Sequence, residues 1–137
     1  MNFVKLTEIA TAMRDDEVGG KINHHVSFVL YKNRILSIGK NNHKTHPINL
    51  LNPKFNRELV NISSEKKTCS ELAAIIKLKN TSNVAFNRCS LINIRVDRTG
   101  VLNNSCPCSS CKSLIKYFGF KNVFYSNELG EFVEYIY

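Results

Sequence analysis

The sequence predicts one α/β domain in which amphipathic helices alternate with short strands. Three observations support this class. Apolar residues recur at helical spacing in three segments, runs rich in β-branched and aromatic residues lie between them, and clusters of Gly, Asn and Asp separate the two kinds of segment. The chain has 137 residues, of which 43% are hydrophobic, and this size suits a single core spanning residues 1–137.

The first predicted helix covers residues 2–14, where Phe3, Leu6, Ala10 and Met13 form an apolar stripe. The predicted elements that follow are a hairpin of strands at 26–31 and 35–39 that turns at Asn33, a helix at 70–79, a strand at 91–96, a helix that begins at Pro107 and stops at Gly119, and strands at 122–126 and 131–137. The link between the last two strands is too short for a crossover helix, so we expect them to be antiparallel.

A long polar segment separates the hairpin from the second helix. It runs from Lys40 to about Lys67 and holds Asn41, Asn42, His43 and His46. Loops of this length are typically functional or disordered. The two histidines are interpreted either as ordinary loop residues or as residues that line a pocket or bind phosphate.

A pair of thiols marks the start of the third helix, in Pro107-Cys108-x-x-Cys111. Proline is favoured at the first position of a helix, so we expect Ser105 or Cys106 to cap it. Cys108 and Cys111 are then three residues apart on one face. The helix N-terminus favours anions and lowers thiol pKa values, which predicts two thiolates that can share one metal ion.

The start of the second helix supplies a third thiol and a carboxylate, in Cys69-Ser70-Glu71. A catalytic zinc takes three protein ligands and keeps its fourth position for water. Cys69 is the candidate third ligand. Glu71, two residues further on, is close enough to exchange protons with water at the metal without binding the metal itself.

Each motif also has a structural interpretation. A Cys-x-x-Cys pair is typical of structural zinc half-sites and of redox pairs as well. A structural zinc requires a fourth ligand, for which Cys106, Cys89 or a histidine is available. Thr68-x-x-Glu71 fits a capping box, in which Glu71 only satisfies backbone donors.

Taken together, Cys69-x-Glu71 and Pro107-Cys108-x-x-Cys111 resemble the signature of the cytidine deaminase-like superfamily of zinc hydrolases, in its variant with three cysteines. The resemblance implies a three-layer α-β-α fold with a mixed five-stranded sheet whose last two strands are antiparallel. It implies Zn²⁺ on Cys69, Cys108 and Cys111, with Glu71 as the proton shuttle. The implied reaction is hydrolytic deamination of a cytosine-type base of a nucleoside or nucleotide, with release of ammonia.

The resemblance also suggests substrate-binding positions. Asn41 would contact the sugar or the base, with Asn42 as the second choice and Ser70 beside them; the residues alone leave open that the asparagines only turn the chain. A cysteine as first ligand and antiparallel last strands resemble free-nucleoside deaminases. Residues 97–105 depart from the commonest family pattern, in which the strand runs almost directly into Pro-Cys-x-x-Cys.

Composition limits the partners. The net charge is +8, which favours anionic partners, but the lysines are scattered, as on a solvated basic surface. Two alternatives therefore stay open: a deaminase that edits single-stranded DNA or RNA, and a zinc-stabilised nucleotide-binding module without activity. No apolar run has the length of a membrane span and no signal-peptide pattern is present, so we expect a cytoplasmic protein. The resemblance implies a homo-oligomer.

Overall fold

The computed structural model describes residues 2–13, 24–41, 69–79, 84–97 and 100–136. The helices and strands within these ranges are, in chain order, α1 (Phe3–Ala12), β1 (His24–Tyr31), β2 (Arg34–Lys40), α3 (Ser70–Lys79), the 3₁₀ helix η3 (Phe86–Arg88), β3 (Ser90–Val96), β4 (Leu102–Asn103), α4 (Ser109–Phe118), β5 (Asn122–Ser126) and β6 (Phe132–Glu134).

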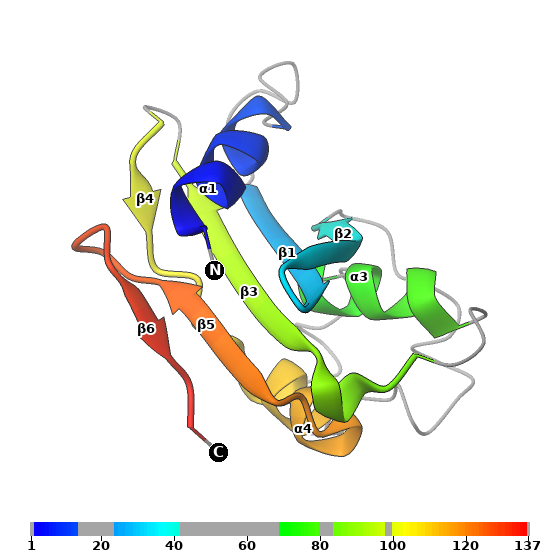
Figure 1. Ribbon diagram of the computed structural model, residues 1–137. Helices are drawn as coiled ribbons and strands as arrows, with labels where there is room; N and C mark the ends of the chain where they lie inside the picture. Colours follow the sequence, from blue (N-terminus) through cyan, green and yellow to red (C-terminus); the bar gives the residue numbers. More distant parts are fainter. Residues whose placement is uncertain (1, 14–23, 42–68, 80–83, 98–99, 137) are drawn as a thin grey trace.

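The strands form one mixed sheet in the order β2-β1-β3-β5-β6, with β4 paired to the end of β3 (Figure 1). β3 and β5 are parallel, and the other pairs are antiparallel. The antiparallel pairing of β5 with β6 confirms the prediction made from their short link. The sheet has the five predicted strands and a sixth, β4, because Leu102 and Asn103 pair with the end of β3.

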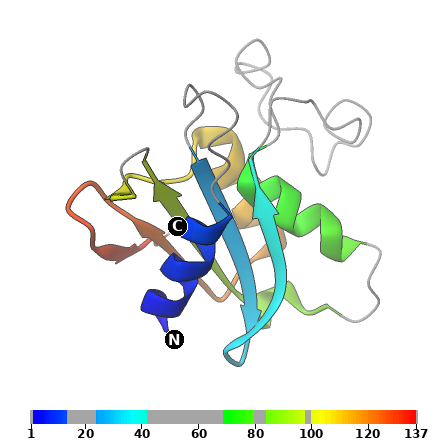
Figure 2. The same cartoon turned by 90° about the horizontal axis from the view of Figure 1, so that it is seen from above.

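Helices cover both faces of the sheet, as the predicted three-layer fold requires. α1 lies on one face, and α3 and α4 lie on the other (Figure 2). Alternation along β1 divides the core accordingly: Phe28 and Leu30 belong to the cluster under α1, whereas Val29 belongs to the cluster under α3 and α4. No helix of the described residues is long and apolar enough to cross a membrane.

Contacts between β2 and α3 set the position of the second helix. Ser37 Oγ donates a hydrogen bond to the Ala74 carbonyl oxygen at 2.8 Å, and Lys77 Nζ donates to the Ile38 carbonyl oxygen. Gly39 lies so close to α3 that a Cβ added to it would be 2.3 Å from both Ser70 O and Ala74 N. The absence of a side chain at residue 39 therefore allows the helix backbone to rest directly on the strand.

The ends of α4 differ in how well the sequence predicts them. Gly119 ends the helix in the left-handed conformation with φ 67°, as predicted. At the other end, the predicted start at Pro107 is wrong, because the cap is Cys108 and the first helical residue is Ser109. The predicted caps, Ser105 and Cys106, are wrong for the same reason. Ser105 instead pairs with the sheet, where its N–H donates to the Ser126 carbonyl oxygen at 2.8 Å.

The first hairpin follows its predicted turn. Lys32 and Asn33 both have positive φ, 48° and 64°, which is the requirement of a two-residue turn between twisted strands. At the C-terminal end, the predicted strand at 131–137 is shorter in the structure, where β6 covers Phe132–Glu134. A hydrogen bond from Tyr135 N to the Val123 carbonyl oxygen at 2.7 Å continues the pairing beyond it.

Candidate metal centre and active site

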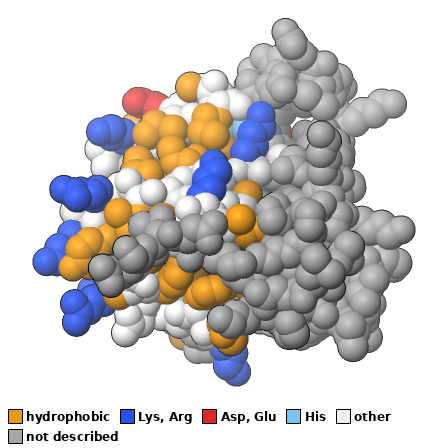
Figure 3. Space-filling view, turned by 90° about the vertical axis from the view of Figure 1, so that its right-hand side faces the viewer, with side chains coloured by type: hydrophobic (Ala, Val, Ile, Leu, Met, Phe, Trp, Pro, Cys, Tyr) orange, Lys and Arg blue, Asp and Glu red, His pale blue; other side chains and the backbone are white. Residues whose placement is uncertain are grey.

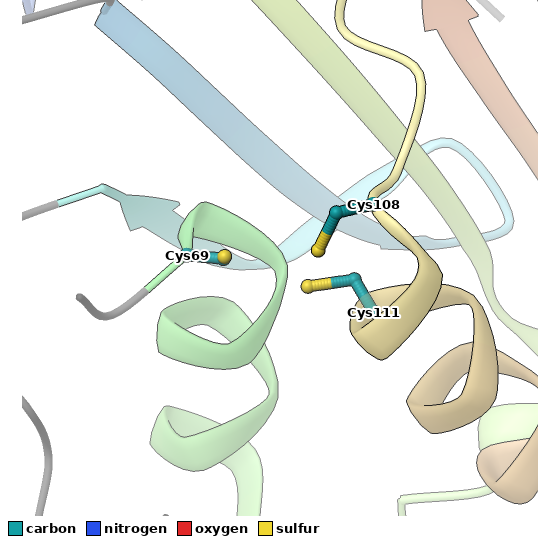
Figure 4. A group of neighbouring side chains, drawn as sticks. All are labelled: Cys69, Cys108 and Cys111. Atoms are coloured by element: carbon teal, nitrogen blue, oxygen red, sulfur yellow. The ribbon is translucent and has the colours of Figure 1, made fainter. Parts of the chain in front are cut away.

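Three thiols meet where α3 and α4 begin. Cys69 directly precedes α3, Cys108 caps α4, and Cys111 lies in the first turn of α4. Their sulfur atoms all lie within 4.8 Å of one another. Figure 4 shows the three side chains pointing toward a common centre. The structure thus brings together the three residues that the sequence predicts as metal ligands.

The thiol geometry fits a zinc ion. Tetrahedral coordination with Zn–S bonds of about 2.3 Å places ligand sulfurs about 3.8 Å apart. Sulfurs that already lie within 4.8 Å of one another need only a small contraction to reach that separation. Thiolates are ligands that zinc prefers, and two helix N-termini add partial positive charge on the ligand side.

The protonation of the thiols differs from the prediction. A hydrogen bond with Cys108, together with burial and the Glu71 carboxylate, raises the pKa of Cys69 to about 12. Hydrogen bonds with Cys108 and Cys69, together with burial, raise the pKa of Cys111 well above its ordinary value. The expectation that helix N-termini lower these pKa values is therefore wrong for Cys69 and Cys111 when no metal is bound. A divalent cation reverses this balance, because it deprotonates the thiols that bind it.

Glu71 lies in the first turn of α3 and is 6% exposed. Its Oε1 accepts a hydrogen bond from Ser70 Oγ at 3.0 Å, and its carboxyl group is also hydrogen-bonded by the Cys111 thiol. Burial is the largest cause that raises the pKa of Glu71, and the charge of Cys108 adds to it. The Glu71 carboxyl group also accepts a hydrogen bond from its own backbone N–H, which is not the donor that the capping box would use. Thr68, the other member of that capping box, is outside the described residues.

The sheet beneath the thiols carries polar residues that the sequence analysis did not single out. His25 pairs with Arg95, and Ser27 pairs with Asn93, across β1 and β3. Burial and the positive charge of Arg95 lower the pKa of His25 to about 4, whereas the Cys108 thiolate charge acts in the opposite direction. In the sequence, the available signal for these four residues was the occurrence of polar residues at every second position of two otherwise apolar strands.

The predicted substrate-binding residues fall in different surroundings. Asn41 follows β2 and pairs with His25: its N–H donates to the His25 carbonyl oxygen at 3.2 Å, and its Oδ1 accepts from the His25 N–H at 3.0 Å. Ser70 is buried, and its hydroxyl contacts Glu71 and Ser27. A role for Asn41 or Ser70 in substrate binding stays a prediction. Asn42, His43 and His46 lie outside the described residues.

The other two cysteines are not part of the thiol group. Cys89 is buried, and its thiol donates to the Ala85 carbonyl oxygen at 3.3 Å. The backbone N–H of Cys106 donates to Asn104 Oδ1 at 3.0 Å, and its sulfur is not in the group of Cys69, Cys108 and Cys111. None of the five cysteines forms a disulfide. Among the described cysteines, therefore, no fourth thiol closes the site.

Comparison with known proteins gives one informative result. No family model matches the chain, and no curated protein matches it. Among solved structures, the chain is similar to a crystal structure of a dCMP deaminase from the cyanophage S-TIM5 in apo form. The likeness covers 90% of this chain and 84% of the phage protein, with a TM-score of 0.51 and 19% sequence identity. The chain has the cytidine deaminase-like fold.

Proposed function

We propose that this protein is a zinc-dependent hydrolytic deaminase that converts a cytosine-type base of a nucleoside or nucleotide to a uracil-type base and releases ammonia. The observation that carries the proposal is the convergence of three sulfurs within 4.8 Å of one another, with a buried carboxylate hydrogen-bonded to one of them. A redox pair needs only two thiols, so it does not account for the third.

Cys69, Cys108 and Cys111 would hold the metal. Bound there, zinc lowers the pKa of a water molecule and so supplies a nucleophile at neutral pH. The three thiols come from two helices that rest on one sheet, so their spacing does not depend on substrate. When no metal is bound, the Cys111 thiol is hydrogen-bonded to the Glu71 carboxyl group, so the acid lies directly beside a proposed metal ligand.

Glu71 would move the protons of the reaction. Its carboxylate takes a proton from the attacking water and delivers it to the ring nitrogen next to the reacting carbon. It then takes the second proton from the same oxygen and delivers it to the amine as the carbon–nitrogen bond breaks. One water is consumed, one ammonia leaves and Glu71 ends in its starting state. Burial suits this role, because it raises the pKa of the carboxyl group toward the working pH.

Asn41 is the proposed substrate-binding residue for sugar or base, with Asn42 as the second choice. The support is its position. Asn41 follows β2 and is hydrogen-bonded to His25 of β1, and His25 lies close enough to Cys108 for the charge of Cys108 to affect its pKa. Whether the substrate is a nucleoside or a nucleotide is left to experiment. The antiparallel β6 resembles free-nucleoside deaminases, whereas the similar solved structure is that of a dCMP deaminase.

Ammonia release from a panel of substrates tests the proposal. The zinc-loaded protein would be incubated with cytidine, deoxycytidine, their 5′-monophosphates, adenine and guanine nucleosides, and cytosine-containing single-stranded oligonucleotides. We expect turnover of at least one cytosine monomer. Glu71→Gln should keep its zinc and lose about 10²–10⁴-fold in kcat. Zinc-loaded protein that releases no ammonia from any member of the panel would refute the proposal, and normal turnover by the variant would refute the role of Glu71.

A polynucleotide substrate is the second candidate, and the charge of +8 favours it. On the described part of the face drawn in Figure 3, however, Lys and Arg side chains are interspersed with hydrophobic and uncharged groups. The same oligonucleotides decide between the two. Turnover of oligonucleotides alone, with binding that weakens steeply as salt is added, would replace the monomer substrate with a polynucleotide.

Two further properties belong to the proposal. A reducing compartment such as the cytoplasm would keep the three thiols available for metal. We also propose a homo-oligomer, in which a neighbouring subunit completes the substrate pocket. Sedimentation of the zinc-loaded protein would test this assembly.

A further inference from the structure

A row of buried polar side chains connects Glu71 to the middle of the sheet. Ser70 Oγ donates to Glu71 Oε1 at 3.0 Å and lies 2.7 Å from Ser27 Oγ, and Ser27 Oγ lies 2.7 Å from Asn93 Oδ1. None of the four side chains is more than 6% exposed. We call these four residues the Ser27 network.

The Ser27 network replaces part of an apolar core. Ser27 and Asn93 face each other across β1 and β3, and the next pair on the same face, Val29 and Leu91, is apolar and fully buried. A buried polar group costs free energy unless it is hydrogen-bonded, and at best a satisfied network returns a modest gain. Packing alone would be served by apolar side chains at these positions, so the polar row calls for a reason beyond stability.

From this geometry we propose that Ser27 and Asn93 are positioning residues, which hold the Glu71 carboxyl group toward Cys111 through the hydroxyl of Ser70. The inference rests on the proposed function of Glu71. A serine hydroxyl by itself can turn about two bonds, so the contact from Ser70 alone does not fix the carboxyl group. Ser27 Oγ lies 2.7 Å from Ser70 Oγ and 2.7 Å from Asn93 Oδ1, so these contacts hold the Ser70 oxygen atom in place while its single proton can point to Glu71 or to Ser27.

Hydroxyl groups suit this task because each of them can donate or accept a hydrogen bond. A proton shuttle alternates between a carboxylate and a carboxylic acid. Ser70 can donate to Glu71 in the first state and accept from it in the second, without moving its oxygen atom. A fixed donor such as lysine would hold only one of the two states.

The far end of the Ser27 network reaches the other half of the metal centre. Ser105 Oγ donates to the Asn93 carbonyl oxygen at 2.8 Å, and Asn93 Nδ2 donates to the Ser105 carbonyl oxygen at 3.5 Å. Ser105 precedes Cys108 by three residues. Asn93 is therefore hydrogen-bonded both to Ser27, on the side of Glu71, and to Ser105, on the side of Cys108. Through these bonds, one strand residue sets the separation between the Glu71 carboxyl group and Cys108.

Ser27→Ala tests the inference, with Ser37→Ala as the matched control. Each variant removes one buried hydroxyl between the sheet and α3, but Ser37 donates to the Ala74 carbonyl oxygen and is not hydrogen-bonded to any residue of the Ser27 network. We expect Ser27→Ala to keep its zinc content and its KM and to lose about 10–100-fold in kcat, because small misplacements of a catalytic group are costly. Ser37→Ala should keep its kcat, because the hydrogen bond from Lys77 and the close contact at Gly39 still hold α3 on β2.

A crystal structure of each variant supplies a readout that does not depend on turnover. We expect one orientation of the Glu71 carboxyl group in the wild type and in Ser37→Ala, and more than one in Ser27→Ala. A single wild-type orientation together with normal kcat in Ser27→Ala would overturn the inference. If the wild type itself deaminates nothing, the proposed function fails, and the orientation of Glu71 alone decides the inference. Should Ser27→Ala not fold, Ser70→Ala carries the same expectations for zinc content, kcat and the orientation of Glu71.

Discussion

Replacing Gly39 with alanine should loosen the metal centre from a distance. The added Cβ would lie 2.3 Å from Ser70 O and Ala74 N, whereas ordinary contact begins at 3.4 Å, so α3 or β2 must move by about 1.1 Å (3.4 minus 2.3). The obstacle is helix backbone rather than the end of a flexible side chain, so we expect the upper part of the usual cost of overpacking, about 2–3 kcal/mol. For a chain of this size, that corresponds to a fall in Tm of about 6–12 °C.

The shift also reaches the ligands, because Cys69 directly precedes the displaced turn of α3. Zinc–sulfur distances tolerate only about 0.2 Å. For all three thiols to bind zinc, α3 must move back against the added Cβ of residue 39. The free energy of that movement is subtracted from the free energy of zinc binding. A penalty of about 2–3 kcal/mol lowers zinc affinity by about 30–150-fold.

Two measurements check the effect of Gly39→Ala. Thermal unfolding followed by circular dichroism gives the loss of stability, and competition with a chromophoric chelator gives the zinc affinity. Gly130→Ala is the control, since residue 130 has φ of +78° but open space around its Cβ position. It should cost about 1–2 kcal/mol from backbone strain and leave zinc affinity unchanged. Wild-type Tm and zinc affinity in Gly39→Ala would refute the reasoning.

Three further predictions follow from the site. Cys111→Ser should lose zinc whereas Cys106→Ser should keep it, as measured by atomic absorption; metal loss in the second variant would indicate a closed four-ligand site. His25 has a pKa of about 4 in the folded protein, below its ordinary 6.5, so the wild type should lose stability as the pH falls from 6.5 to 4. In urea titrations with chelator present, His25→Gln should show a smaller loss of unfolding free energy over this pH range. An equal loss in both proteins would contradict the lowered pKa. Asn41→Ala should raise KM for the active substrate by about tenfold with little change in kcat, the pattern of lost uniform binding. An unchanged KM would remove Asn41 from the substrate site.

Periodic features of the fold were predictable from the sequence. The apolar spacing of 70–79 predicts α3 with its observed bounds, and Gly119 predicts the end of α4. The turn at Asn33 is also as predicted. In each case the signal is local, because it depends on residues within one turn of helix or one hairpin.

Tertiary features were less accessible. β4 has only two residues, Leu102 and Asn103, which is too short for any periodicity. Pro107 satisfies the local rule for a helix start, but pairing of Ser105 with Ser126 holds the preceding segment extended and delays the helix until Ser109. No local pattern reveals such a competition between sheet and helix.

The residues that meet at the candidate site were predictable from the sequence, but the residues that support them were not. Three cysteines and Glu71 stand out because their residue types and spacing match a known chemistry. Ser27 and Asn93 are common residue types in ordinary strand positions, and only the register of β1 against β3 shows that they meet beneath Ser70. Gly39 belongs to the same group, since its importance comes from a helix that begins thirty-one residues later (70 minus 39).

The three-thiol centre has a mechanical consequence for the whole molecule. A metal held by Cys69 and Cys108 would join positions 39 residues apart (108 minus 69) and tie the start of α3 to the start of α4. Treated as a covalent cross-link, a closure of that length removes about 4 kcal/mol of conformational entropy from the unfolded chain. Zinc would therefore stabilise the fold as well as take part in the reaction, and a chelator would both abolish activity and lower the free energy of unfolding.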